Sequence, residues 1–244
     1  MAKIFIDPGH GAHDPGAVGK RSKEKDNVLT VGLRLKTLLE SAGHTVKMSR
    51  STDVFIELSD RAKVANAWRA DYFISLHNNS ATSNVSGFET FIFDGAVSAA
   101  TSKLQVAIHN AIATKIGIKD RGKKRANYAV LRESKMPAVL IEYGFISNTG
   151  DESILINKVE QLAQWTAQGI TAYAGGSVKP AAKPQNEDFE MAQLLPNTQK
   201  DDMKNLLQRA YDEKVFNVNH SSKVDTMTRG QVLDLLISYN ARKK

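Results

Sequence analysis

The chain has 244 residues and no cysteine, so it can form neither a disulfide nor a thiolate metal site. Any bound metal ion must be held by histidines and carboxylates. No apolar run approaches the roughly 20 residues needed to cross a bilayer, so we expect no stable membrane insertion. The stretch Met1–Pro8 is too short in apolar residues for a secretory signal, which predicts synthesis in the cytoplasm without a signal peptide.

The charge is not strongly of one sign. The chain has 33 Lys and Arg against 26 Asp and Glu, a net charge of +7. Such an excess favours polyanionic partners, among them nucleic acid, anionic lipid and the acidic polymers of a bacterial wall. The basic residues are interspersed with acidic ones and form no stripe flanked by aromatics, so we expect no nucleic-acid partner.

Short β-branched runs alternate with longer helical patterns over the first 174 residues. This order predicts an α/β fold, with a twisted, mostly parallel sheet flanked by helices. The predicted strands are Lys3–Ile6, Thr45–Met48, Tyr72–Leu76, Gly87–Phe93 and Val139–Glu142. The predicted helices, with apolar residues at three- and four-residue spacing, are Lys23–Ala42, Leu58–Arg69, Val97–Ile116 and Glu152–Ala174.

The composition changes after residue 175, where small residues and two prolines replace the periodic pattern. This composition is typical of a linker. We therefore predict a first domain over residues 1–175, a linker over 176–186 and a small, mainly α-helical module over 187–244. The helices expected in that module are Lys200–Glu213 and Arg229–Asn240.

Three segments place a metal-binding type of side chain at the end of a predicted strand or the start of a helix, where open α/β sheets put their active sites. They carry His10, Glu24 and His77. Two of these residues also have ordinary structural interpretations, because His10 could cap a turn and Glu24 could be a solvated carboxylate at a helix start. His77 precedes two asparagines and is poorly suited to an apolar core, which favours a functional role over a structural one.

Two histidines and one glutamate form an accepted catalytic zinc set, because three protein ligands leave a position open to water. Glu142 ends the apolar run Val139–Glu142 and supplies a candidate general base, since burying a charge there costs free energy unless it is paired or working. The other histidines are expected to be structural or exposed. They are His13, His44, His109 and His220.

Together these residues resemble the zinc N-acetylmuramoyl-L-alanine amidases, a family that includes sporulation and autolytic amidases and many phage lysins. The resemblance covers about Lys3–Ala174. The motifs that carry it are Ile6–Gly11, Glu24–Lys25, Leu58–Ala62 with Ala65–Asn66, Ser75–Asn79, Arg121–Gly122, Val130–Arg132 and Glu142–Phe145.

The resemblance implies a peptidoglycan substrate, cut at the amide bond between the lactyl group of the glycan and the L-alanine of the stem peptide. It also implies one catalytic Zn²⁺ held by His10, Glu24 and His77, with Glu142 as the catalytic carboxylate. Two departures are mild. Ala12 stands where the family usually has a second glycine, and Asn78 where it usually has a small or aliphatic residue.

Two arginines within these motifs leave alternatives open. Arg61 or Arg132 could bind substrate carboxylates, or both could belong to the salt-bridged scaffold. Residues 227–236 look like the closing helix of surface-layer-homology and related wall-binding modules, which implies a wall polymer as a partner of the C-terminal module. A dimerisation or solubility appendage is the alternative for that module.

The layout of a catalytic domain, a linker and a small module resembles that of a bacteriophage endolysin. Such an enzyme would reach the cell wall through a holin or after lysis of the cell. Three alternatives remain at this stage: a bacterial sporulation or autolytic amidase, a zinc peptidase that acts on free peptides, and a non-catalytic wall-binding protein of the same fold.

Overall fold

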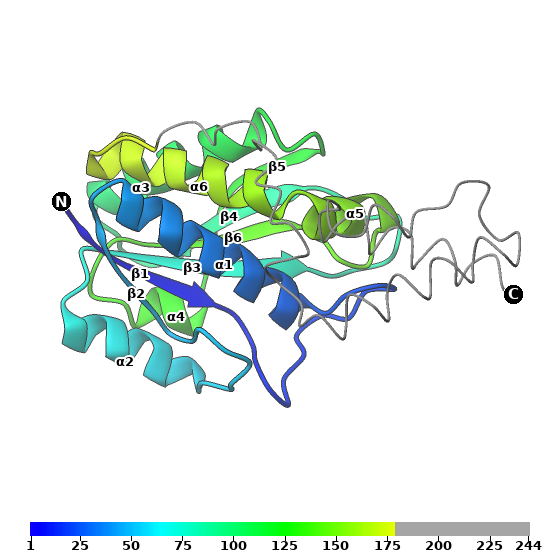
Figure 1. Cartoon of the computed structure of the whole chain (residues 1–244), viewed down its shortest axis with the longest axis horizontal. Coiled ribbons are helices and arrows are strands. Elements are labelled where there is room, and N and C mark those ends of the chain that lie inside the picture. Colours follow the sequence, from blue (N-terminus) through cyan, green and yellow to red (C-terminus); the bar gives the residue numbers. More distant parts are fainter. Residues whose placement is uncertain (179–244) are drawn as a thin grey trace, which may run out of the picture. The chain divides into compact units, whose positions relative to one another are not determined.

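A computed structural model describes residues 1–178, and within them one mixed sheet has the strand order β2-β1-β3-β6-β4-β5 (Figure 1). The strands are β1 (Lys3–Pro8), β2 (Thr45–Met48), β3 (Tyr72–Asn79), β4 (Phe88–Phe93), β5 (Asp120–Ala126) and β6 (Ala138–Phe145). All neighbouring pairs are parallel except β4 and β6, which are antiparallel. The predicted fold class, an α/β domain with a mostly parallel sheet, is confirmed.

Helices cover both faces of the sheet (Figure 1). One face carries α1 (Glu24–Ser41), α3 (Ala99–Ala113) and α6 (Val159–Ala174), and the other carries α2 (Leu58–Trp68) and the single turn α4 (Ala129–Arg132). Each face has its own apolar cluster. Leu35, Leu104 and Ile170 belong to the first cluster, and Phe73 and Leu131 to the second.

Strand β6 lies in the middle of the sheet, and all eight of its residues are buried. A strand covered on both faces is expected to read as a continuous apolar run, and this one does so except at Glu142. The carboxyl ends of β1, β3 and β6 meet at one edge of the sheet, because these strands are parallel. That edge is the place where the sequence predicted a site.

Two elements were not predicted. Strand β5 has the sequence Asp-Arg-Gly-Lys-Lys-Arg-Ala, which shows no apolar alternation, and it lies at the end of the strand order. Charged side chains are common on edge strands, because they discourage pairing with another chain. Helix α4 is a single turn, too short for a periodic pattern to reveal.

The predicted helix Glu152–Ala174 is wrong as a single element. It is two helices, α5 (Thr149–Asn157) and α6, separated at Lys158, whose φ of −111° and ψ of 29° leave the helical region. Helix α5 is tied to the sheet by Asp151, which accepts hydrogen bonds from the backbone N–H groups of Gly87 and Phe145. Helix α6 instead packs along α1 and α3. Because the two helices have different partners, the chain changes direction between them.

The predicted linker, apart from residues 176–178, and the predicted module 187–244 lie outside the described residues. So do the two helices expected in that module and His220. Within residues 1–178, no helix combines the length and the apolar character that a membrane span requires.

Candidate metal centre and catalytic site

The three predicted ligands come together at the edge of the sheet where β1 and β3 end and α1 begins. His10 follows β1, Glu24 is the first residue of α1, and His77 lies near the end of β3. One ligand atom from each residue lies within 4.8 Å of the others. In the part of the chain that is described, no other group of three or more His, Asp or Glu side chains converges in this way.

Glu24 lies at the centre of this group. Its Oε1 is 3.1 Å from His10 Nε2 and 2.8 Å from His77 Nδ1. The same oxygen accepts the backbone N–H of Asn78, and Oε2 accepts the N–H of Ala17. Burial by itself would raise the pKa of Glu24, but the hydrogen bonds and charges of the two histidines lower it well below its ordinary value. Glu24 is therefore held as a fully hydrogen-bonded carboxylate.

Glycines make room for the ligands. A Cβ atom at Gly9 would lie 2.2 Å from the His77 ring, and one at Gly16 would lie 2.6 Å from His10 Cδ2. The backbone of the loop is also unusual, because His10 and Ala12 have φ values of 61° and 49°. The family usually has glycine at the position of Ala12, and its left-handed conformation explains that preference. Gly9 and Gly16 therefore matter to the ligand geometry, although neither binds a ligand itself.

Asp14 orients the first histidine. Its Oδ2 lies 2.8 Å from His10 Nδ1, so the opposite ring nitrogen, Nε2, faces Glu24. A carboxylate on the outer nitrogen is the usual partner of a metal-binding histidine, because it fixes the tautomer and the ring orientation. Asp14 was not predicted from the sequence. The signal that could have found it is the short polar loop after His10, which carries a carboxylate four residues from the histidine.

Glu142 stands beside the cluster on the neighbouring strand, where its Cα is the register partner of His77. The residue is buried, and its Oε2 has no hydrogen-bond partner among the described residues. Burial, and then the negative charges of Glu24 and Glu89, raise the pKa of Glu142 well above its ordinary value. An unpartnered buried carboxyl of this kind is rare unless it serves a reaction or a ligand.

A cavity of about 420 Å³ joins these groups. His10, His77 and Glu142 line it together with Asp7 and Arg61. The rest of its wall is mostly apolar and comes mainly from two segments, residues 55–58 before and at the start of α2 and residues 128–130 at the start of α4. A mostly apolar cavity with a few converging polar groups is the usual form of a binding site for a substrate.

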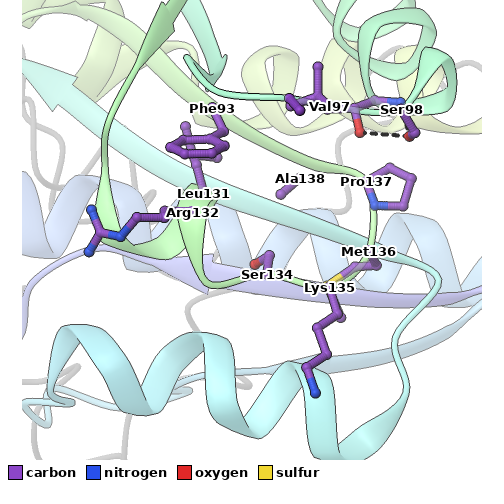
Figure 2. Close-up of a pocket in the computed structure, with 12 residues that line it drawn as sticks. Phe93, Val97, Ser98, Leu131, Arg132, Ser134, Lys135, Met136, Pro137 and Ala138 are labelled. Carbon is purple, nitrogen blue, oxygen red and sulfur yellow. Dashed lines mark hydrogen bonds between the residues drawn. The ribbon is translucent and has the colours of Figure 1, made fainter.

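A second cavity, of about 240 Å³, lies on the same face of the sheet beyond α4. None of its lining residues is a histidine or a carboxylate, so it offers none of the side chains from which the predicted metal site is built. Figure 2 shows Arg132 and Lys135 extending outward, away from the apolar lining formed by Leu131 and Ala138. His10, His77 and Glu142 line the first cavity and not this one.

The two arginines of the sequence motifs have different surroundings. Arg61 is buried, pairs with Asp7 at 2.9 Å and donates hydrogen bonds to the backbone carbonyls of Pro8 and His10. It is scaffold that holds the loop carrying His10. Arg132 donates to Asn127 Oδ1 and lines the second cavity, not the one that holds Glu142.

The other described histidines lie outside the ligand cluster. His44 and His109 are buried, and their hydrogen bonds join structural elements: His44 Nδ1 accepts the N–H of Ala2, and His109 lies between Thr90 and Asp120. His13 is exposed and packs against Phe55, with ring centroids 4.3 Å apart. All three agree with the expectation that they are structural or exposed.

Comparison with known proteins gives consistent results. Residues 4–172 match the family described as N-acetylmuramoyl-L-alanine amidase. The chain is 44% identical over 174 residues to the sporulation-specific N-acetylmuramoyl-L-alanine amidase of Bacillus subtilis (strain 168), covering 70% of this chain and 67% of that protein. It is 42% identical over 209 residues to the endolysin of Bacillus phage SPP1, covering 80% of this chain and 76% of the endolysin.

A solved structure is similar as well. It is the catalytic domain of CwlV, an N-acetylmuramoyl-L-alanine amidase from Bacillus (Paenibacillus) polymyxa var. colistinus. The TM-score is 0.68 at 37% sequence identity, and the match covers 72% of this chain and 100% of that domain. The fold described above is therefore that of an amidase catalytic domain.

Proposed function

This chain belongs to the N-acetylmuramoyl-L-alanine amidase family and is a peptidoglycan amidase, and from that premise we propose that it is a zinc-dependent enzyme whose catalytic base is Glu142. The bond cut is the amide between the lactyl group of the glycan and the L-alanine of the stem peptide. The observation that carries the proposal is the unpartnered Oε2 of Glu142, buried on the strand next to His77.

The donor set fits a zinc ion. Two imidazole nitrogens and one carboxylate oxygen converge within 4.8 Å, and the sequence has no cysteine that could add a thiolate ligand. His10, Glu24 and His77 would hold the ion, with Asp14 fixing the His10 ring. When bound, Zn²⁺ would polarise the scissile carbonyl and make water more acidic.

Glu142 performs the proton transfers. Its raised pKa suits a group that first accepts a proton from the attacking water and then returns it to the leaving nitrogen of L-alanine. The apolar wall of the cavity limits competing water around this carboxyl, which strengthens the electrostatic interactions of the site. Arg61 holds the His10 loop throughout and takes no part in the proton transfer.

The test is digestion of purified Gram-positive peptidoglycan, with and without a chelator. New amino-terminal alanine that disappears with the chelator, without new reducing sugar ends, is the expected result. Activity on free dipeptides instead would identify a zinc peptidase. Binding to the wall without release of amino termini would identify a non-catalytic protein.

For the biological role we propose a phage endolysin. The supporting observation is that the match to the SPP1 endolysin covers 80% of this chain, whereas the match to the sporulation-specific amidase covers 70%. Expression in a Gram-positive host should cause lysis only when a holin is co-expressed. A bacterial sporulation or autolytic role is the second candidate, supported by the 44% identity to the sporulation-specific amidase, and it predicts no dependence on a holin.

The predicted module 187–244 would hold the enzyme on its insoluble substrate through a wall polymer, which raises the local concentration of the catalytic domain. Sedimentation with intact walls tests this proposal. The Glu142→Gln form of the full chain should sediment with the walls, and the same variant lacking residues 187–244 should remain in solution. Equal sedimentation of the two would reject a wall-binding role for the module.

A further inference from the structure

The catalytic residues belong to a row that continues across the sheet beyond Glu142. In the strand register, His77 of β3 pairs with Glu142 of β6, and Glu142 pairs with Glu89 of β4. Paired residues on neighbouring strands project from the same face, and neighbouring strands lie about 4.8 Å apart. Glu89 is therefore the next side chain after Glu142, the proposed base. Strand β5 lies two strand spacings, or about 10 Å, from β6, which carries Glu142.

Glu89 forms ion pairs with two cationic side chains, Arg121 and Lys124. It is a buried carboxylate whose Oε1 accepts from Asn79 Nδ2 at 2.6 Å. Its Oε2 accepts from Arg121 Nε at 3.0 Å and also from Lys124 Nζ. One carboxylate and two cations leave a net positive charge. The side chain of Glu89 is 4% exposed, whereas those of Arg121 and Lys124 are 28% and 36% exposed, so the excess charge faces solvent.

The Arg121 guanidinium is held in place by its contacts but keeps N–H groups that make no hydrogen bond within residues 1–178. It lies over the Phe145 ring, 4.9 Å from the centroid. Its hydrogen bonds within residues 1–178 use Nε, to Glu89, and Nη1, to the carbonyl of Ser86 at 3.4 Å. These leave the N–H groups of Nη2 for a ligand. A guanidinium held by stacking and by one carboxylate is well suited to bind a second carboxylate.

The cation pair also adjoins the cavity. Tyr128 lines that cavity, and burial followed by the negative charges of Glu142 and Glu89 raises its pKa, so the phenol is within range of both carboxylates. Tyr128 also packs on Phe91, over which Lys124 Nζ lies at 5.8 Å. Lys124 therefore lies beside the Tyr128 wall of the cavity, and Arg121 shares the carboxylate of Glu89 with Lys124.

We propose that Arg121 and Lys124, held by Glu89, form a subsite for a carboxylate of the stem peptide on the leaving-group side of the scissile bond. This inference rests on the proposed amidase function. An extended peptide spans at most about 3.5 Å per residue, so about 10 Å corresponds to the first three residues after the scissile nitrogen. The carboxylate bound is therefore one carried near the start of the stem peptide.

A matched control separates a subsite from general attraction between opposite charges. Lys123 lies on the same strand and is exposed, and its charge acts on His109, which packs on the opposite face of the sheet. Lys123→Gln removes the same charge as Arg121→Gln without touching Glu89. Any loss that both variants share comes from long-range electrostatics.

The experiment compares two soluble muramoyl-tripeptides, one with free peptide carboxylates and one with these carboxylates amidated. We expect the wild-type enzyme to have a KM about tenfold lower for the free form, the size of a charge-assisted hydrogen bond. Arg121→Gln should remove this preference by raising the KM of the free form alone, with kcat within about twofold. Lys123→Gln should keep the preference. Lys124→Gln is the second variant, because Arg121 also packs on Phe145.

Several outcomes would overturn the inference. They are an undiminished preference for the free form in both Arg121→Gln and Lys124→Gln, an equal rise in KM for both peptides, and an equal loss in Lys123→Gln. Each of these leaves the amidase activity intact. If the wild-type enzyme produced new alanine amino termini from neither peptide, the proposed function would fail, and the subsite with it.

Discussion

Glu24 and Glu142 are both buried glutamates at the same edge of the sheet, yet their surroundings are opposite. Glu24 receives two backbone N–H groups and faces two imidazoles, whereas Glu142 Oε2 has no partner within residues 1–178. The pKa of Glu24 is accordingly lowered and that of Glu142 raised. The comparison teaches that the surroundings shift the pKa values of two identical side chains in opposite directions, which suits one to metal binding and, in the proposed mechanism, the other to proton transfer.

The variant Glu142→Gln tests most directly whether Glu142 is the proton carrier. We expect turnover to fall roughly 10³-fold, within the range of general acid–base catalysis, with zinc still bound. Turnover is measured as release of alanine amino termini, and zinc by elemental analysis after dialysis. His77→Ala is the contrasting variant, because it should lose both the metal and the activity. Turnover retained in Glu142→Gln would show that another group is the base.

Glu24→Gln tests the other half of the comparison. An amide cannot supply the negative charge that the site provides to a metal, so we expect zinc affinity to fall at least about 10²-fold. Asp14→Asn should weaken zinc binding less, by roughly tenfold, because Asp14 only orients His10. Competition with a chromogenic chelator measures both. An equal loss in the two variants would contradict the assignment of Glu24 as ligand and Asp14 as support.

Gly16→Ala asks whether the space beside Glu24 is required. The new Cβ would lie 2.6 Å from His10 Cδ2 and 2.7 Å from Glu24 Oε2, in a backbone with φ of 64°. We expect a loss of about 2 to 4 kcal/mol in the free energy of unfolding, from strain and overpacking together. Gly43→Ala has a similar φ of 91° and meets nothing within 4 Å, so it isolates the backbone part. Urea unfolding of both variants measures the difference, and equal losses would mean that the contact costs nothing.

The smallest expected effect is on the pH dependence of the metal-free protein. Because its folded pKa is raised, Glu142 keeps its proton in the native state while the unfolded chain releases it above about pH 4.3. Stability therefore falls as the pH rises from there towards the folded pKa, and Glu142→Gln removes this fall. Glu24 acts with the opposite sign: its contribution is present above the unfolded pKa and lost as the pH falls.

Urea unfolding of the wild type and Glu142→Gln, at a series of pH values in chelator, measures this difference. Because both proteins share Glu24 and the histidines, these groups contribute nearly equally to the two curves. The variant should gain stability relative to the wild type as the pH rises. A difference that does not change with pH would show that Glu142 titrates normally in the folded chain.

Much of the fold could be predicted from the sequence, because its strands and helices are dominated by local apolar periodicity. The buried strand β6 and helix α1 are clear examples, and their predicted positions agree with the structure to within a few residues. Strand β5 could not be predicted, because its pairing with β4 does not depend on its own apolar residues. The break at Lys158 depends on which surfaces α5 and α6 pack against, and no local pattern contains that information.

The site shows the same division. His10, Glu24, His77 and Glu142 could be selected because their chemical type is unusual for their places in strands and helix starts, and the structure brings them together. Glu89 gave no comparable signal, since a glutamate in the middle of the predicted strand Gly87–Phe93 has the alternation of an ordinary exposed position. Its meaning depends on the antiparallel register between β4 and β6, which places it beside Glu142.

The row formed by His77, Glu142 and Glu89 runs perpendicular to the strands. The relative positions of these side chains therefore depend on the register of the hydrogen-bond ladders that join the strands. A slip of one residue between β3 and β6 would turn Glu142 to the opposite face of the sheet. A slip of two residues would restore the face but move the carboxyl about 7 Å along the strand. If Glu142 is the base, as proposed, enzyme activity requires this register, and its recovery during refolding measures the fraction of molecules that have reached it.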